Sequence, residues 1–227
     1  MKRVITVLLA ALLVLSLAAC GSGVETKKLA GTWTCTIDVT DRMNAAAEQA
    51  LGLSAADGAA KMPLQLVLTV TEDGAYTLRY DSDAARTALD AYAAALHPAA
   101  VESVYAAAEE QGLSREEYDA AMEKAGITMD DMVAAIFAGV DEEELLSLLT
   151  GRSAAITGYC RAEGGQLYLA DTAAELAETA DCLSYTLSDG TMTWTDAQGE
   201  LSSQLTEQEQ ELLRVPLTWT KRAEESK

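Results

Sequence analysis

The sequence predicts an α+β protein, a sheet of eight or nine strands that carries a multi-helix insertion. Two stretches, 29–80 and 151–223, contain segments in which apolar and polar residues alternate, as in strands with one buried face. Turn signals separate these segments at Asp73-Gly74, Gly164-Gly165 and Asp189-Gly190. Between the two stretches, residues 83–150 are rich in Ala, Glu and Met and follow a helical period.

The first twenty residues have the order of a signal peptide. Basic Lys2 and Arg3 precede an apolar run from Val4 to Leu17, which is too short for a comfortable membrane span. The run ends in Leu17-Ala18-Ala19-Cys20, which resembles the lipobox of bacterial lipoproteins. The resemblance implies lipid on the Cys20 sulfur and removal of residues 1–19. A plain secretory signal or a short membrane anchor, with a chance cysteine, is the alternative.

Lipidation would make this an extracytoplasmic protein tethered to a bacterial membrane, at the cell surface or in the periplasm. Two or more acyl chains anchor a protein stably, whereas one does not. Residues 20–28 then form a lipidated, flexible tether, since 21–28 hold two glycines, a serine and three charges. The remaining chain suits one domain, expected at 29–223.

Charge excludes some partners. Removal of Lys2 and Arg3 with the signal leaves 14 basic against 36 acidic side chains, a net charge of about −22. Nucleic acid is therefore not expected as a partner, because its binding needs basic residues to neutralise phosphates. Direct docking on anionic lipid is disfavoured for the same reason. Solubility alone accounts for such acidity.

The cysteines leave the disulfide state open. Besides Cys20 the chain has Cys35, Cys160 and Cys182, so at most one internal bridge forms and one thiol remains. Cys160 and Cys182 are the closer pair in sequence, but a simple meander places them at opposite ends of the intervening strand. Cys35 is then the free thiol.

The first strand is expected at 31–39, with Trp33, Cys35, Ile37 and Val39 on its buried face. Asp41 is expected to cap a helix that runs towards Leu51, before glycines and Pro63 break the chain. A hairpin follows. On its first strand, Leu64, Leu66, Leu68 and Val70 are expected to lie on one face. On its return strand, Tyr76, Leu78 and Tyr80 are expected to lie on one face.

Several short helices are expected in the insertion. His97-Pro98 ends one helix, because proline cannot continue it. Capping boxes at Ser114/Glu117 and Thr128/Asp131 begin two more, and Gly126 closes the first of these. Asp141 opens a last helix that Gly151 stops. An apolar group of the insertion is read either as core packed against the sheet or as a partner or ligand groove; it consists of Met122, Met129, Met132, Ile136 and Phe137.

After Gly151 the period returns to two. Strands are expected at 155–160 and 166–170, then after a helical or loop piece at about 172–180, at 183–187 and through Met192 and Trp194. A turn at Gln198-Gly199 and a polar stretch precede a final strand through Leu217, Trp219 and Lys221. The tail 224–227 is expected to fray.

The two ends of this domain resemble those of lipocalin-like barrels. Leu29-Ala30-Gly31-Thr32-Trp33 is similar to the Gly-x-Trp start of that family, and Leu217 to Arg222 to its closing strand. The resemblance implies an antiparallel barrel of about eight strands, with Gly31, Trp33, Trp219, Lys221 and Arg222 at its closure. The family's Thr-Asp-Tyr loop is absent, and the long insertion departs from its layout, so its ligand cavity does not simply carry over.

No motif for catalysis, a cofactor or a metal is found. His97 is the single histidine and is expected to be exposed before Pro98. The acidic run 141–144 suits the first turn of a helix better than calcium. Asp81-Ser82-Asp83 starts like a calcium loop but lacks its glycine, since Arg86 stands there. An enzyme is therefore not expected.

Two functions remain. The first is a non-enzymatic protein that binds a small apolar or amphipathic ligand in the barrel or its mouth. The second is a structural or interaction protein of the cell envelope, whose acidic helical insertion contacts a partner protein.

Cys20→Ser is expected to release the protein from the membrane, because it removes the sulfur that would carry the lipid. Fractionation and mass spectrometry of the N-terminus check this. Ala19→Ser, which leaves the sulfur in place, is the control, and membrane retention of Cys20→Ser contradicts the lipoprotein hypothesis.

Overall fold

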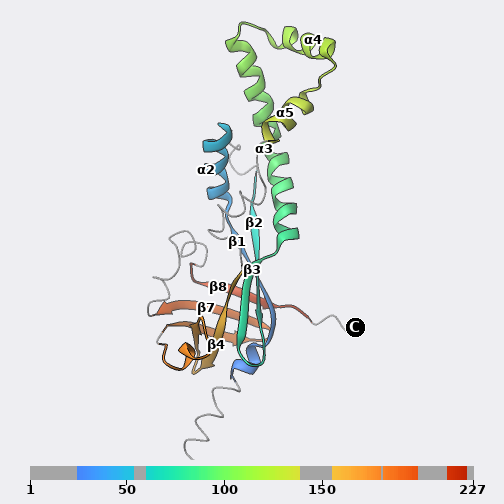
Figure 1. Ribbon diagram of the computed structural model, residues 1–227. Coiled ribbons are helices and arrows are strands. Elements are labelled where there is room, and N and C mark those ends of the chain that lie inside the picture. Colours follow the sequence, from blue (N-terminus) through green and yellow to red (C-terminus); the bar gives the residue numbers. More distant parts are fainter. Residues whose placement is uncertain (1–24, 54–59, 139–154, 180, 199–213, 224–227) are drawn as a thin grey trace, which may run out of the picture. The chain divides into compact units, whose positions relative to one another are not determined.

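A computed structural model describes residues 25–53, 60–138, 155–179, 181–198 and 214–223 of the 227-residue chain. Residues 25–29 form a short helical segment before the first strand. The elements that follow, labelled in Figure 1, are β1 (Gly31–Asp38), α2 (Thr40–Leu51), β2 (Pro63–Val70), β3 (Ala75–Tyr80), α3 (Ser82–Glu110), α4 (Arg115–Ala125), α5 (Met129–Phe137), β4 (Ile156–Glu163), β5 (Gln166–Ala170), the 3₁₀ turn η1 (Glu175–Ala177), β6 (Cys182–Ser188), β7 (Thr191–Gln198) and β8 (Leu217–Lys221).

The chain divides into two compact units. One comprises Met1–Cys35, Leu66–Tyr80 and Ala154–Lys227 and contains most of the strand residues; the other comprises Thr36–Gln65 and Asp81–Ser153 and contains α2 to α5. We call them the barrel unit and the helical unit. Strands β1 and β2 contribute residues to both. The expectation that 29–223 folds as a single domain stays a prediction.

The strands form a closed barrel in the order β1 to β8. The neighbouring strands from β2 to β8 pair antiparallel, and β8 pairs antiparallel with β1 through Trp33 opposite Lys221 and Thr34 opposite Thr220. Closure leaves no free sheet edge at which another chain could pair. The predicted antiparallel barrel of about eight strands with additional helices is therefore confirmed at that level.

Register keeps the apolar side chains on one face around the barrel. Leu68 lies opposite Leu78, Leu167 opposite Leu183, and Met192 opposite Trp219. Residues that face each other across a ladder point to the same side of the sheet. Met192 and Trp219 are fully buried, so the alternation seen in the sequence forms the barrel core.

The β2–β3 turn ends in Gly74, which has a φ of +88°. A Cβ at this position would collide with the backbone carbonyl oxygen of Cys160 on β4. Glycine is needed there both for its positive φ and for the close approach of two strands. The hairpin predicted at 64–80 is confirmed in its strands and its turn.

Helix α2 begins at Thr40, two residues earlier than a cap at Asp41 implies. Asp41, predicted as its cap, lies within the first turn, and Val39 at the N-cap makes no side-chain cap. The carboxylate of Asp38 instead accepts a hydrogen bond from the Thr40 amide at 2.9 Å. The prediction of Asp41 as cap is wrong, because a carboxylate two residues before the helix occupies that role.

Helix α3 continues through Pro98 for 29 residues, so the break predicted at His97-Pro98 is also wrong. Pro98 has no N–H group to donate to the Ala94 carbonyl oxygen. Ala94 and Pro98 both lie on the exposed face of the helix, where water can solvate this oxygen. Leu96 and Ala100, on either side of Pro98, are buried and hold the helix across the defect.

The local signals for α4 and α5 are confirmed. Ser114 with Glu117, and Thr128 with Asp131, form complete capping boxes, and Gly126 ends α4 in the left-handed conformation. Arg115 joins α4 to α3 through a bidentate pair with Glu102 and lies 4.7 Å from the Tyr105 ring. These contacts are exposed, so they orient the helices more than they stabilise them.

Several predicted features lie outside the described residues: the signal segment 1–19 with Cys20, the helix from Asp141, Gly199 of the predicted turn with the polar stretch after it, and the tail 224–227. Within the described ranges, no helix has the length and apolar character needed to cross a membrane.

Pro98→Ala is expected to stabilise the protein by about 2 kcal/mol, because proline costs about 3 kcal/mol in a helix interior and returns part of this by stiffening the unfolded chain. Urea unfolding followed by far-ultraviolet circular dichroism measures the change. Pro63→Ala, at the exposed start of β2, is the control and should stay within about 0.5 kcal/mol. If Pro98→Ala does not increase the free energy of unfolding, the continuous helix α3 is contradicted and the helix end predicted at His97-Pro98 is favoured.

Candidate functional site

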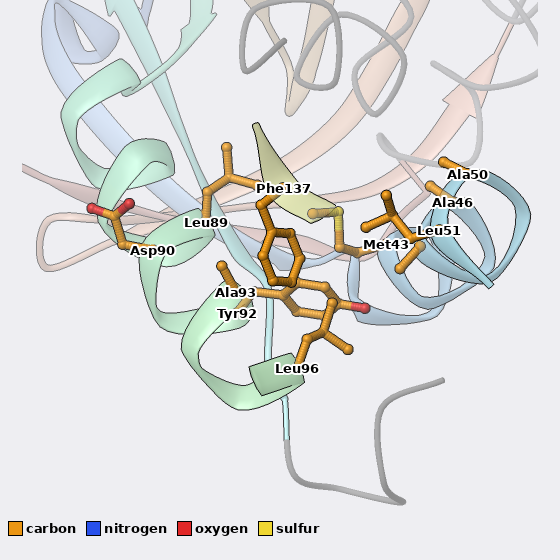
Figure 2. Close-up of a pocket in the computed structure, with 11 residues that line it drawn as sticks. Met43, Ala46, Ala50, Leu51, Leu89, Asp90, Tyr92, Ala93, Leu96 and Phe137 are labelled. Carbon is orange, nitrogen blue, oxygen red and sulfur yellow. The ribbon is translucent and has the colours of Figure 1, made fainter. Parts of the chain in front are cut away.

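The helical unit contains an apolar pocket of about 200 Å³ (Figure 2). Its walls come from α2, α3 and α5. The lining residues are Met43, Ala46, Ala47, Ala50 and Leu51 of α2, Leu89, Asp90, Tyr92, Ala93 and Leu96 of α3, and Phe137 of α5.

Helical spacing accounts for the two long walls. The lining residues of α2 recur at intervals of three and four, as do Leu89, Tyr92, Ala93 and Leu96 on α3, so each helix turns one stripe to the pocket. The α2 stripe contains three alanines, whose small side chains leave the space that larger residues would fill. Figure 2 shows the α2 side chains on one side and those of α3 on the other, with Phe137 between them.

The start of β2 holds the beginnings of both helices. The Val39 amide, just before α2, donates to the Met62 carbonyl at 3.0 Å, and the Met62 amide donates to Thr40 Oγ1 at 2.9 Å. The Asp81 amide, just before α3, donates to the Gln65 carbonyl at 2.8 Å. Backbone hydrogen bonds to residues 62–65 therefore set where α2 and α3 start.

One hydrogen bond joins the two walls. The Tyr92 hydroxyl on α3 donates to the Asn44 side-chain oxygen on α2 at 2.7 Å. Tyr92 is 1% exposed, and this burial raises the pKa of its hydroxyl. The hydroxyl is thus a neutral structural donor that is already engaged. Asp90 is the one charged residue among the described lining residues; it is exposed and lies at the edge of the group in Figure 2.

Phe137 links the pocket to a small core. Leu53, Ala100 and Val133 form that core, and Phe137 packs against it together with Leu51, Val101, Met129 and Ile136. The apolar stripe predicted on 129–137 therefore packs within the helical unit, where it contributes Phe137 to the pocket. The α2 wall of the pocket was not predicted from the sequence, although the helical spacing of Met43, Ala47 and Leu51 indicates an apolar stripe there.

The proposed closure residues of the barrel lie together. The Lys221 ammonium is 5.3 Å from the centre of the Trp33 ring, and Gly31 leaves room for the Lys221 side chain. The Trp33 indole N–H donates to the Leu29 carbonyl at 2.7 Å, and the Arg222 amide donates to the Thr32 carbonyl at 2.8 Å. These contacts join the two ends of the barrel sequence.

The Trp219 ring contacts the Trp194 ring in a tilted arrangement, with ring centres 4.8 Å apart and 48° between the ring planes. Both indole N–H groups are buried without a hydrogen-bond partner among the described residues. Both tryptophans are buried side chains of adjacent strands, so their surroundings are those of core residues.

The bridge left open for Cys160 and Cys182 does not form: both are free thiols, and both are buried, as is Cys35. Strand β5 separates the pair, since Cys160 lies opposite Leu169 and Cys182 opposite Tyr168. Two strand spacings amount to about 9.6 Å, beyond the reach of a disulfide. Burial raises the pKa of all three thiols, that of Cys160 to about 12.

His97 is half exposed, with Nε2 3.1 Å from a carboxylate oxygen of Asp130 on α5. Asp81 caps α3 by accepting from the Ala84 amide at 3.3 Å. Within the described part of the chain, no three His, Cys, Asp or Glu side chains gather in a metal-binding arrangement. Cys20 and the acidic run 141–144 lie outside it.

The chain matches no protein-family model, no curated protein and no solved structure.

In the Cys20→Ser variant, the three remaining thiols are expected to resist alkylation at pH 9. A thiol of pKa about 12 has about a thousandth of its molecules ionised there, and the thiolate is the nucleophile. Because burial favours the neutral thiol, folding stability is expected to fall as pH rises from 9 towards 12. The resistance to alkylation is measured by comparing the rate of iodoacetamide labelling in the native protein with the rate in the urea-unfolded protein. Rapid labelling of the native protein that disappears in Cys160→Ala would contradict the predicted resistance.

Proposed function

We propose that this chain is an extracytoplasmic lipoprotein that binds a small apolar or amphipathic ligand without transforming it. The observation that carries the proposal is the apolar pocket between α2 and α3. We place the ligand there, on the helical unit, whereas the sequence suggested the barrel or its mouth.

The size and lining of the pocket support this role. An apolar cavity of about 150 Å³ is enough to bind benzene, while drug-sized sites start near 300 Å³. A pocket of about 200 Å³ therefore suits one ring or a short chain, with the rest of a larger ligand outside. Ten of its eleven lining residues are aliphatic or aromatic.

The barrel serves as scaffold in this proposal. Its lipocalin-like character rests on the Gly31-to-Trp33 start and the Leu217-to-Arg222 end, and the antiparallel pairing of β1 with β8 supports it. Lipid on Cys20 would keep the protein at a membrane, where apolar ligands concentrate. Binding rather than catalysis is our proposal because the described lining residues include no Ser, Cys, Lys or His, and the Tyr92 hydroxyl already donates to Asn44.

A second proposal, contact with an envelope protein, draws on α4. Met122 is its one buried side chain among eleven residues, and Glu116 and Glu117 add charge to its first turn. A helix exposed on nearly all sides is either solvated or contacts a partner. A pocket that binds none of the probes below would favour this role.

Ala46→Leu is expected to block the pocket, because its added carbons enter space left by an alanine of the α2 wall. Phe137 is the only phenylalanine in the chain, so incorporated 4-fluorophenylalanine gives one ¹⁹F resonance in the pocket. Toluene should shift this resonance in the full chain, held in phosphatidylcholine nanodiscs, and should shift it at least tenfold less in Ala46→Leu.

The matched control is Ala45→Leu, one residue earlier on the exposed side of α2 and outside the lining. It should retain the response to toluene. Equal responses in both variants, or none in the unmodified chain, would refute the pocket as the ligand site.

A further inference from the structure

Among the described residues that line the pocket, none would receive a negative charge. None of them is Lys, Arg, His, Asn, Gln, Ser or Thr. The Tyr92 hydroxyl, the one side-chain donor of the lining, already donates to Asn44. A carboxylate drawn to this site would lose water without gaining a partner, which costs free energy.

The charged residue that does line the pocket is acidic. Asp90 lies on the exposed side of α3 at the edge of the lining, apart from Phe137 and Tyr92 in Figure 2. Arg42 and Arg86 occur on α2 and α3, but neither is a lining residue. An amphipathic ligand whose apolar part lies among Tyr92, Leu96 and Phe137 would have its polar end meet a carboxylate at the edge.

The charge of the whole chain acts in the same direction. The formal net charge is −20, with 36 acidic against 16 basic side chains. Such a field concentrates cations near the protein and repels anions, and it weakens as salt is added. Anionic amphiphiles such as fatty acids and bile acids therefore meet repulsion at this site.

We propose that the pocket selects cationic amphiphiles, which place one aromatic ring or short alkyl chain between α2 and α3 and an ammonium group beside Asp90. This inference rests on the proposed ligand-binding function and narrows its ligand class. The pocket volume of about 200 Å³ limits the buried part to about the size of a phenyl or phenylethyl group.

Three probes that share a phenyl group test the charge preference: 2-phenylethylammonium, 2-phenylethanol and phenylacetate. Each is titrated at low salt against the full chain in phosphatidylcholine nanodiscs, and the ¹⁹F resonance of fluorinated residue 137 reports occupancy. The cation is expected to bind about two- to fivefold more tightly than the alcohol, the range of an exposed charge pair, and the anion more weakly than both.

Asp90→Asn should remove the advantage of the cation over the alcohol, measured as the ratio of their two dissociation constants in the same variant. Glu110→Gln removes the same charge from the end of α3, outside the pocket lining, and should retain most of that advantage. Added salt of about 0.5 M should reduce the preference in the unmodified chain, because it screens exposed charges.

The outcomes separate the two proposals. If no probe shifts the resonance, the proposed function fails and this inference fails with it. If the alcohol or phenylacetate binds as tightly as the cation, the pocket binds ligands but the cation preference is refuted. A preference that survives Asp90→Asn would refute the role of that carboxylate.

Discussion

The hydrogen bonds made by residues 62–65 at the start of β2 are the constraint on which the helical unit depends. They fix the residues that precede α2 on one side and α3 on the other. The two helices differ in length, and their facing stripes lie at 43–51 of α2 and 89–96 of α3. Where the helices begin thus decides which residues face each other, so the pocket follows from these few backbone contacts.

The pocket also reflects a balance between packing and space. Large side chains in place of the α2 alanines would bury more apolar area, at about 25 cal/mol per Å². The chain instead keeps small residues there and joins the helices through Tyr92 and Asn44. A buried hydrogen bond of this kind contributes about 1 kcal/mol and fixes a distance between helices, which apolar contacts alone do less specifically.

Local signals made much of the fold predictable. Turns such as Glu72-Asp73-Gly74 and the capping boxes at Ser114 and Thr128 involve residues within a few positions, so their physics is visible in the sequence. Pro98 was misread because its cost depends on whether tertiary packing holds the helix on both sides, and Leu96 and Ala100 do so. The pocket was missed for a related reason, since an alanine-rich stripe on α2 has meaning only against the stripe of α3 that faces it.

The barrel unit and the helical unit meet two requirements that would conflict within one core, a tightly packed interior and an open pocket. A carrier barrel has to keep its interior open, whereas the described strands turn large buried residues inward, among them Trp33, Met192 and Trp219. Aromatic residues each bury about 150–250 Å², so this core supplies stability that a hollow barrel would lack. Because the packed barrel core supplies this stability, small residues can line a pocket on α2 and α3 without weakening the sheet. In the proposed function, charge gives that pocket its selectivity, because an apolar site of this size distinguishes ligands poorly by shape alone, and a carboxylate at its edge would act on the one part of an amphiphile that remains outside.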